Sequence, residues 1–210
     1  MAEAWGRTLM LTGRGRGDSL SVVSPMPSLS DLNNSDRAAF TAALGHLFEH
    51  SPWVAEQGWL RRPFRDAAHL HAKLCATMRA APPEWQLALI RAHPDLAGRL
   101  QGPELASGEL AESVEGARLP KLTADSTREQ ASAGLDRLTD AELAEFTRLN
   151  AAYKAKFEFP FIICARLNAK AAMLAAMQSR LSNEWPVERD TALAEIEKIA
   201  WLRLKDTLKD

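Results

Sequence analysis

Apolar residues recur every three to four positions through most of the chain from Ser35 onward, and this spacing restricts the fold more than any other feature. Phe40, Leu44 and Leu47 form one such series. Residues spaced in this way lie on one face of an α-helix, and that face is buried against neighbouring helices. No convincing strand pattern accompanies them. The sequence therefore predicts an all-α fold, a single-domain bundle of about eight helices.

Capping residues and prolines predict where the helices begin. The expected caps or first residues are Asn34 or Ser35, Pro52, Asp66, Pro83, Ser126 with Glu129 as a capping box, Thr139 with Glu142 as another, Pro160, and Val187. The Pro83 helix is expected to end at His93, and the Pro160 helix near Met177. Residues 96–122 show no clear period and predict a loop with a short helix.

Charge and cysteine content narrow the class of protein. The net charge is −1, from 26 basic and 27 acidic residues, so the sequence gives no reason to expect binding to nucleic acid or to a membrane surface. No stretch approaches the ~18 uninterrupted apolar residues of a membrane span. Cys75 and Cys164 each lie in an apolar context, which is typical of buried free thiols in a reducing compartment. We therefore expect a cytoplasmic protein.

The first 25 residues differ from the rest of the chain. They contain GRGRGDS and show little periodicity, which predicts a flexible N-terminal leader. The folded domain is accordingly expected to cover residues 26–210, and Met26 is a possible true start of the protein.

His93 is the first candidate for chemistry. Within the stretch WQLALIRAHPDL (85–96), Trp85, Leu89 and His93 are spaced to share one helix face, so the imidazole is expected to point into the core. Free carbonyl groups at a helix C-terminus favour imidazolium, and Asp95 is placed to orient one ring nitrogen. We therefore expect a histidine pKa near or above ~6.5, as a general acid at neutral pH requires. The alternative is a hydrogen-bonded core histidine without a catalytic role.

Three further residues suggest a binding site for a polar ligand. Arg203 interrupts the apolar face of the last predicted helix, and a buried guanidinium needs a carboxylate or an anionic ligand. A structural ion pair or a side chain reaching to solvent also explains it. Ser126 and Glu129 at a helix start form a cradle with the free N–H groups, although capping alone accounts for both. The segment 160–165 is expected to add main-chain N–H groups of the helix after Pro160.

A different reading comes from His46-Leu-Phe-Glu49-His50, which matches the zinc-peptidase pattern H-x-x-E-H. If the segment is helical, both histidines lie on one face, where they can bind zinc while Glu49 activates water. A third ligand has to come from elsewhere in the chain. A zinc-dependent hydrolase is therefore an alternative function.

Several separate segments together resemble one family. They are FEHSPW (48–53), RAHPDLAGRL (91–100), LTADSTREQASAGLDRL (122–138), NAAYKAKFEFPFIICARLN (150–168) and AEIEKIAWLRL (194–204). In content and order they resemble the decarboxylases of 2-oxo-4-hydroxy-4-carboxy-5-ureidoimidazoline (OHCU), over about residues 28–208. Several motifs in the right order are much more specific than any one of them.

This resemblance implies roles for individual residues. His93 is the catalytic acid and base, Glu129 and Gln130 hold the ureido and ring amides, and Arg203 pairs with an anionic part of the substrate. The other implied substrate contacts are Pro94, Ser126, Thr127 and Arg128, and, through the main chain, Phe161, Ile162, Ile163, Cys164 and Ala165. Glu158 is a departure, because the family more often has glycine before the FPF run.

The resemblance also implies a reaction, the conversion of OHCU to (S)-allantoin in urate degradation. The carboxylate of OHCU lies next to a ring C=N that accepts the electrons released with CO2, so neither a metal nor an organic cofactor is expected. A homodimer is implied, with a urate hydroxylase and a hydroxyisourate hydrolase as pathway neighbours. A helical binding module without chemistry, in which His93, Glu129 and Arg203 are only core and cap groups, is the remaining alternative.

Overall fold

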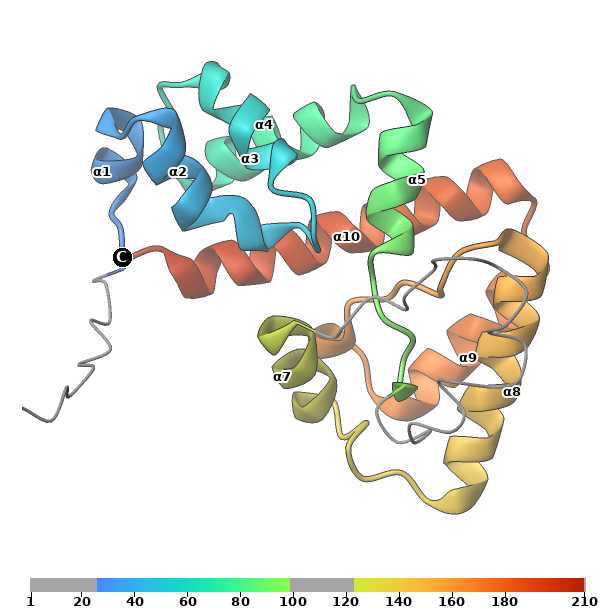
Figure 1. Cartoon of the computed structure of the whole chain (residues 1–210). Helices are drawn as coiled ribbons and strands as arrows, with labels where there is room; N and C mark the ends of the chain where they lie inside the picture. Colours follow the sequence, from blue (N-terminus) through green and yellow to red (C-terminus); the bar gives the residue numbers. More distant parts are fainter. Residues whose placement is uncertain (1–25, 99–122, 210) are drawn as a thin grey trace, which may run out of the picture.

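The computed structural model describes residues 26–98 and 123–209 (Figure 1). These two ranges contain nine α-helices and no β-strand, so the predicted all-α class is confirmed. The helices are α1 (Leu29–Asn34), α2 (Arg37–Leu44), α3 (Trp53–Gly58), α4 (Ala67–Arg79), α5 (Pro83–Arg91), α7 (Ala124–Ser132), α8 (Asp140–Phe157), α9 (Lys170–Arg180) and α10 (Trp185–Thr207). Short 3-10 turns occur at η1 (Gly45–Leu47), η2 (Trp59–Arg61) and η4 (Ala165–Leu167).

Helix α10 is the axis of the molecule. It runs across the full width of the fold in Figure 1, with α1–α4 on one side, α7–α9 on the other and α5 crossing it. Its predicted apolar face is confirmed, because Leu193, Ile196, Ala200 and Leu204 are all buried. Arg203 lies on the same buried face, 3% exposed.

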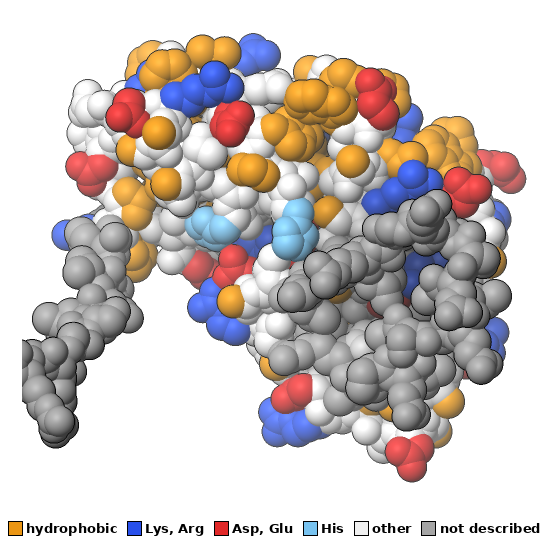
Figure 2. Space-filling model, viewed as in Figure 1, with side chains coloured by type: hydrophobic (Ala, Val, Ile, Leu, Met, Phe, Trp, Pro, Cys, Tyr) orange, Lys and Arg blue, Asp and Glu red, His pale blue; other side chains and the backbone are white. Residues whose placement is uncertain are grey.

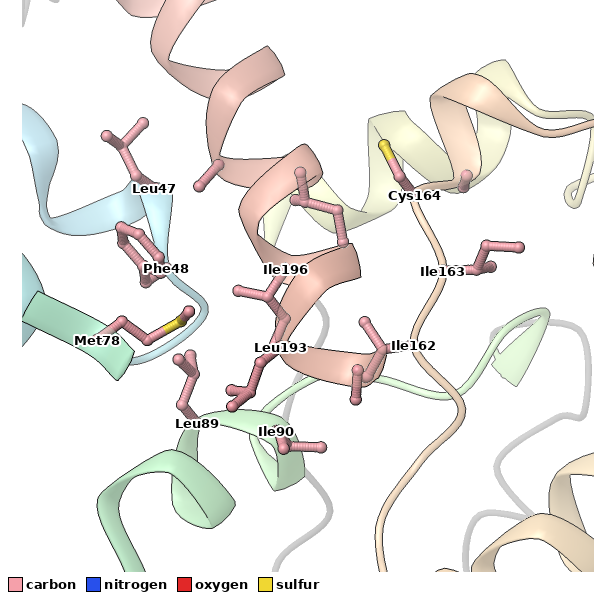
Figure 3. Close-up of a cluster of buried hydrophobic side chains, with 14 of the residues drawn as sticks. Leu47, Phe48, Met78, Leu89, Ile90, Ile162, Ile163, Cys164, Leu193 and Ile196 are labelled. Atoms are coloured by element: carbon pink, nitrogen blue, oxygen red, sulfur yellow. The ribbon is translucent and has the colours of Figure 1, made fainter. Parts of the chain in front are cut away.

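The core forms where the two sides meet on α10. Figure 3 shows Leu47 and Phe48 on one side of Leu193 and Ile196, and Ile162 on the other. All five of these side chains are buried. One apolar cluster therefore joins segments from both halves of the chain.

Several predicted helix starts are confirmed. The Asp66 side chain accepts the main-chain N–H of His69 and caps α4, and Thr139 forms the predicted capping box of α8 with Glu142. Pro83 is the first residue of α5, and Pro52 immediately precedes α3. The last helix begins two residues before the predicted Val187.

The start of the folded region was predicted incorrectly. A helix capped at Asn34 or Ser35 was expected, but α1 is already formed from Leu29 and ends at Asn34. Ser28 caps α1 in a capping box with Asp31, and Asp36 caps α2. α1 was missed because it has only six residues and one buried residue, Leu32, which is too few to show a helical period.

The helix predicted from Pro160 to Met177 is also wrong. Residues 159–164 run without helix or strand, η4 follows, and α9 begins only at Lys170. Phe159, Phe161 and Ile162 are all buried although they are consecutive or nearly so, which a one-sided surface helix does not allow. This segment therefore forms a wall of the core.

The predicted capping box at Ser126 is wrong as well. The cap of α7 is Thr123, whose hydroxyl accepts the Ser126 main-chain N–H at 3.2 Å. Ser126 is thus inside the first turn, and its side chain is free for a different contact. The helix ends at Ser132, before Leu135 and Leu138.

Three predictions remain: the absence of a membrane span, the N-terminal leader and the loop at residues 96–122. Within residues 26–98 and 123–209, none of the helices is long and apolar enough to cross a membrane. The predicted leader, residues 1–25, lies outside the described residues. So does most of the 96–122 segment for which a loop and short helix are expected.

Candidate active site

His93 lies just beyond α5 and points into the protein. The helix ends at Arg91, two residues earlier than predicted, and the His93 side chain is buried at 5% exposure. Leu89 on the same face is fully buried, whereas Trp85 is 42% exposed, so the expected apolar face continues to His93 but does not begin at Trp85. The inward direction of the imidazole is confirmed.

The hydrogen bond of His93 fixes its tautomer. Its Nδ1 is 2.9 Å from the carbonyl oxygen of Leu89, and a carbonyl only accepts, so Nδ1 carries the proton. Nε2 is therefore the bare nitrogen, and within the described residues this buried atom has no hydrogen-bond partner. Asp95 does not orient the ring as predicted, because its carboxylate pairs with Lys154 at 2.7 Å.

The predicted charge of His93 is wrong. Burial lowers the pKa of His93 to about 4, more than the neighbouring Glu49 carboxylate and the Leu89 carbonyl raise it. Removing the ring from water penalises the imidazolium more than the helix C-terminus favours it. His93 is therefore a neutral base with a free lone pair at neutral pH.

Arg203 is held by a complete set of acceptors. Its Nε and Nη2 pair with the two oxygens of Glu129 at 2.9 and 2.8 Å, and Nη1 pairs with Glu49 at 2.9 Å. Nη2 also donates to the Ser126 hydroxyl at 3.1 Å, and Nη1 to the His46 carbonyl at 3.3 Å. All five N–H groups of the guanidinium thus have a partner inside the protein.

Glu49 is the functional residue that sequence reasoning missed as part of this site. It is 1% exposed, and its Oε2 accepts from Arg203 and from the Ser126 hydroxyl at 3.0 Å. Burial alone would raise the pKa of Glu49, but the Arg203 charge holds it below its usual value, so the carboxylate is ionised. A glutamate beside the apolar Phe48 was the available signal, since a buried charge demands a partner.

The opposite wall is the extended segment before η4. Arg180 on α9 donates to the Ile162 carbonyl at 2.8 Å, and its guanidinium lies 4.3 Å from the centre of the Phe161 ring. The fully buried Glu188 of α10 pairs with Arg180. On the next turns of α10, Glu195 accepts the Cys164 main-chain N–H at 2.9 Å. The main chain here is fixed by side-chain contacts, not by the helix that the sequence predicted.

Gln130 fixes the loop that follows His93. Its Oε1 accepts the Ala97 N–H at 3.0 Å, and its Nε2 donates to the Asp95 carbonyl at 3.2 Å. Asn150 of α8 donates to the Leu96 carbonyl at 2.9 Å. Asn150 is thus a buried polar group bonded to the main chain.

These groups line one small, partly open cavity. Of the predicted residues, those that line it are His93, Pro94, Ser126, Glu129, Gln130, Phe161, Ile162, Ile163, Ala165 and Arg203. Leu96 and Ile199 line it too and were not predicted, whereas Thr127, Arg128 and Cys164 are not among the lining residues. The cavity offers only about 30 Å³ to the centres of water molecules, enough for an ordered water.

A larger chamber of about 460 Å³ adjoins this cavity and shares Glu129 and Arg203 with it. Arg128 faces this chamber, where it pairs with Asp125, and Arg166 pairs there with Asp206. Figure 2 shows histidine side chains beside acidic and basic ones in the middle of the face that Figure 1 presents. The Glu129–Arg203 pair is common to the walls of both spaces.

The geometry contradicts the zinc site. The H-x-x-E-H motif requires a helix, but α2 ends at Leu44 and His50 has a left-handed backbone, φ 46°. Glu49 is turned to Arg203, and His46 contacts Thr207 at 3.0 Å. Among the described residues, no group of three or more His, Cys, Asp or Glu side chains is arranged to hold a metal ion.

Comparison with known proteins gives a consistent family. A family model described as OHCU decarboxylase matches residues 33–205. The 2-oxo-4-hydroxy-4-carboxy-5-ureidoimidazoline decarboxylase of Amia calva is 37% identical over 181 residues, covering 86% of this chain and 94% of the relative. The uric acid degradation bifunctional protein PucL of Bacillus subtilis is 36% identical over 185 residues, 88% of this chain but 33% of that protein.

A solved structure adds the fold. The crystal structure of an (S)-allantoin synthase matches with a TM-score of 0.62 at 28% identity, over 87% of this chain. The match spans 54% of that chain, so about half of the allantoin synthase has no counterpart here.

Proposed function

Because this chain belongs to the OHCU decarboxylase family, we propose that the cavity beside His93 is the place where it acts on OHCU. The protein is a carboxy-lyase of urate degradation that converts OHCU to (S)-allantoin with loss of CO2. The observation that carries the assignment of the site is the bare, buried Nε2 of His93 in a cavity that also contains Glu129 and Arg203.

The substrate supplies its own electron sink. When the bond between the ring carbon and the carboxylate breaks, CO2 leaves and the electron pair forms a C=C bond with the carbon that bears the ureido group. The ring nitrogen of the former C=N takes up one proton. The hydroxyl on the carbon that lost CO2 then releases its proton and becomes the carbonyl, and the ureido carbon gains a proton. One proton is consumed overall.

The neutral state of His93 gives it the role of the base. Nε2 accepts the hydroxyl proton, and the resulting imidazolium returns a proton to one face of the ureido carbon. A base with a single fixed lone pair delivers the proton from one side, which accounts for an optically active product. The Leu89 carbonyl keeps Nδ1 protonated throughout and so prevents the other tautomer.

Substrate binding requires an exchange of partners at Arg203. Every N–H of its guanidinium is already used, and the cavity in this state is much smaller than the ~300 Å³ of an ordinary ligand site. We expect the substrate carboxylate to replace Glu129 on Arg203, while Glu129 turns to the ureido N–H groups. Each charge then keeps a partner, so the exchange avoids an unpaired buried ion.

The remaining wall positions the ring. Pro94 and the main chain of residues 161–163 and 165 line the cavity, and Gln130 adds an amide. Arg128 and Thr127, implied as contacts by the family resemblance, do not line this cavity. Arg128 lines the adjoining chamber and reaches the substrate only when that chamber takes part, whereas Thr127 lines neither space.

The test is a turnover assay. OHCU is generated freshly from urate and optical activity is followed. The protein should accelerate the appearance of (S)-allantoin over buffer, and His93→Ala should reduce the rate ~10²-fold or more, with helical circular dichroism unchanged. His69→Ala is the control, since that histidine lies near the start of α4, away from the cavity, and should retain the rate. Full activity of His93→Ala would contradict the site.

We further propose a cytoplasmic homodimer that works beside a urate hydroxylase and a hydroxyisourate hydrolase. The two free, buried cysteines, Cys75 and Cys164, support a reducing compartment. The name of the PucL relative supports a role next to other steps of uric acid degradation. The dimer is supported by the family resemblance, and light scattering of the purified protein at several concentrations tests it.

A further inference from the structure

The carboxylate of Glu49 is in an unusual position for a structural ion. It comes from the turn between η1 and α3, and the whole side chain is removed from solvent. Ionised carboxylates are rarely left in such a position unless both oxygens are satisfied. Its contacts are therefore informative about what else the site holds.

The two oxygens of Glu49 have different surroundings. Oε2 accepts from Arg203 Nη1 at 2.9 Å and from the Ser126 hydroxyl at 3.0 Å. Oε1 is buried and, by distance and angle, accepts no hydrogen bond among the described residues, although the Thr123 side chain lies near enough to help lower the pKa of the carboxyl. An ionised oxygen without a donor costs a few kcal/mol in a folded protein, so it marks a place where a donor arrives during function.

His93 is the group that can supply that donor. Its Nε2 is likewise buried without a partner in the described residues, and the charges of Glu49 and His93 act on each other. The other charged and titratable groups that act on His93 are Arg203 and His50, and both oppose a proton on the ring. Glu49 is the carboxylate that favours it.

The charge balance of the site points the same way. Arg203 carries one positive charge and faces two carboxylates, Glu49 and Glu129. With His93 neutral, the site has one negative charge in excess, and the substrate brings another. This excess negative charge favours an imidazolium at His93 when proton transfer from the substrate forms one.

We propose that Glu49 is a positioning residue that serves as the counter-ion of the His93 imidazolium formed during turnover, while its second oxygen keeps Arg203 and Ser126 in place. This rests on the proposed function. In the proton transfer, the hydroxyl proton moves to Nε2 and then to the ureido carbon. Glu49 stays ionised and makes no bond to the substrate. Its Oε1 contacts the protonated Nε2 of His93, either directly or through a water.

Glu49→Gln tests the proposal by two measurements. The first follows the histidine ring nitrogens by NMR as pH is lowered in the free protein, where we expect the pKa of His93, about 4 in the wild type, to fall by at least one unit. The second is the assay above, in which kcat should fall tenfold or more, while KM changes less. A residue that only shapes the cavity would raise KM and leave the His93 titration in place.

Two further variants control for folding and for the loss of any buried charge. Glu49→Asp keeps the charge at a shorter reach, so its His93 pKa and its kcat should lie between those of Glu49→Gln and the wild type. Glu188→Gln removes another fully buried carboxylate that is paired with an arginine, and it should leave the His93 titration unchanged. These two variants keep the question open to test even if Glu49→Gln folds poorly.

The outcomes separate this inference from the proposed function. An unmoved His93 titration in both Glu49 variants, or a full kcat in Glu49→Gln, would overturn the role of Glu49. A wild-type protein that does not produce (S)-allantoin faster than buffer would overturn the proposed function. The NMR titration does not depend on turnover and remains a measure of the Glu49–His93 coupling in either case.

Discussion

At the scale of single residues, the buried neutral imidazole of His93 makes folding depend on pH. Its pKa is about 4 in the folded protein and ~6.5 in an unfolded chain, so between these values the unfolded chain binds more protons. The part of the free energy of unfolding that comes from keeping the ring neutral is fully present above pH ~6.5, and it is lost as pH falls toward 4. We expect the free energy of unfolding, from urea titrations, to drop by about 2 kcal/mol from pH 7 to 5 on this account.

The control for this prediction is His93→Gln, which cannot titrate and should lose that drop. Glu49 titrates lower, since the pKa of its carboxyl lies below the usual value, and contributes little between pH 5 and 7. Burial also lowers the pKa of His46, so His46→Gln should remove a smaller part with the same sign. An unchanged pH dependence in His93→Gln would show that other groups cause it.

The same residue illustrates what sequence can predict at this scale. The spacing to Leu89 correctly gave the direction of the imidazole, because the period of a helix is a local property. Its charge was predicted incorrectly, because desolvation depends on how completely Ile163, Ile199 and other distant residues cover the ring. Glu49 was missed for the same reason, since its partners Ser126 and Arg203 lie 77 and 154 residues away.

At the scale of the elements, the end of α8 carries a strained residue. Glu158 caps the helix in the left-handed region, φ 62°, a position that favours glycine. Glu158→Gly should therefore raise the free energy of unfolding by about 1 kcal/mol. The exposed ion pair with Arg91 adds little to oppose this, and the Arg91 bond to the residue 158 carbonyl is kept.

Urea unfolding with an unchanged m-value measures this gain. The matched control is Gly134→Ala, which places a side chain at φ 76° with open space around its Cβ. It should lower stability by about 1 kcal/mol, since only the backbone conformation is strained. A Glu158→Gly protein that is no more stable than the wild type would indicate that Arg91 or the neighbouring wall depends on the glutamate side chain.

Element boundaries were predicted well where a single strong signal stood alone. Asp66 and the Thr139–Glu142 box are such cases. At α7, both Thr123 and Ser126 are suitable caps. Thr123 is the cap, and Ser126 lies inside the helix, where its hydroxyl donates to the buried Glu49 carboxylate. The segment after Pro160 was mistaken for a helix because its conformation depends on contacts with Arg180 and with Glu195 of α10. These residues are distant in the sequence, so the local pattern of apolar residues gives no sign of them.

At the scale of the whole molecule, the site exists only because α10 brings distant segments together. Glu49 and His93 come from the first half of the chain, and Glu129 and residues 161–165 from the second. Arg203 lies on α10 and bonds both Glu49 and Glu129. In Figure 1, α1–α4 lie on one side of α10 and α7–α9 on the other, and α5 crosses it. Sequence could name most of these residues through family resemblance, but it could not predict the small size of the cavity or the complete set of partners of the Arg203 guanidinium, which depend on this assembly.

The assembly is also closed at its ends, which gives a last prediction. The Pro27 carbonyl accepts the main-chain N–H of Lys209 at 3.1 Å, so the first described residues are tied to the end of α10. A chain that starts at Met26 keeps this bond and all of α1. We therefore expect it to retain the melting temperature and the decarboxylation rate of the full chain, in agreement with a folded domain of residues 26–210.

A chain that starts at Ser35 is the matched comparison, since it lacks α1. It loses the buried Leu32 and both hydrogen bonds between Asn33 and the Phe64 main chain, at 2.9 and 2.8 Å. These losses together should cost at least ~3 kcal/mol and lower the melting temperature by roughly 10 °C in a chain of this size. If the Met26 chain is destabilised to a similar degree, residues 1–25 belong to the folded unit and the proposed domain boundary is wrong.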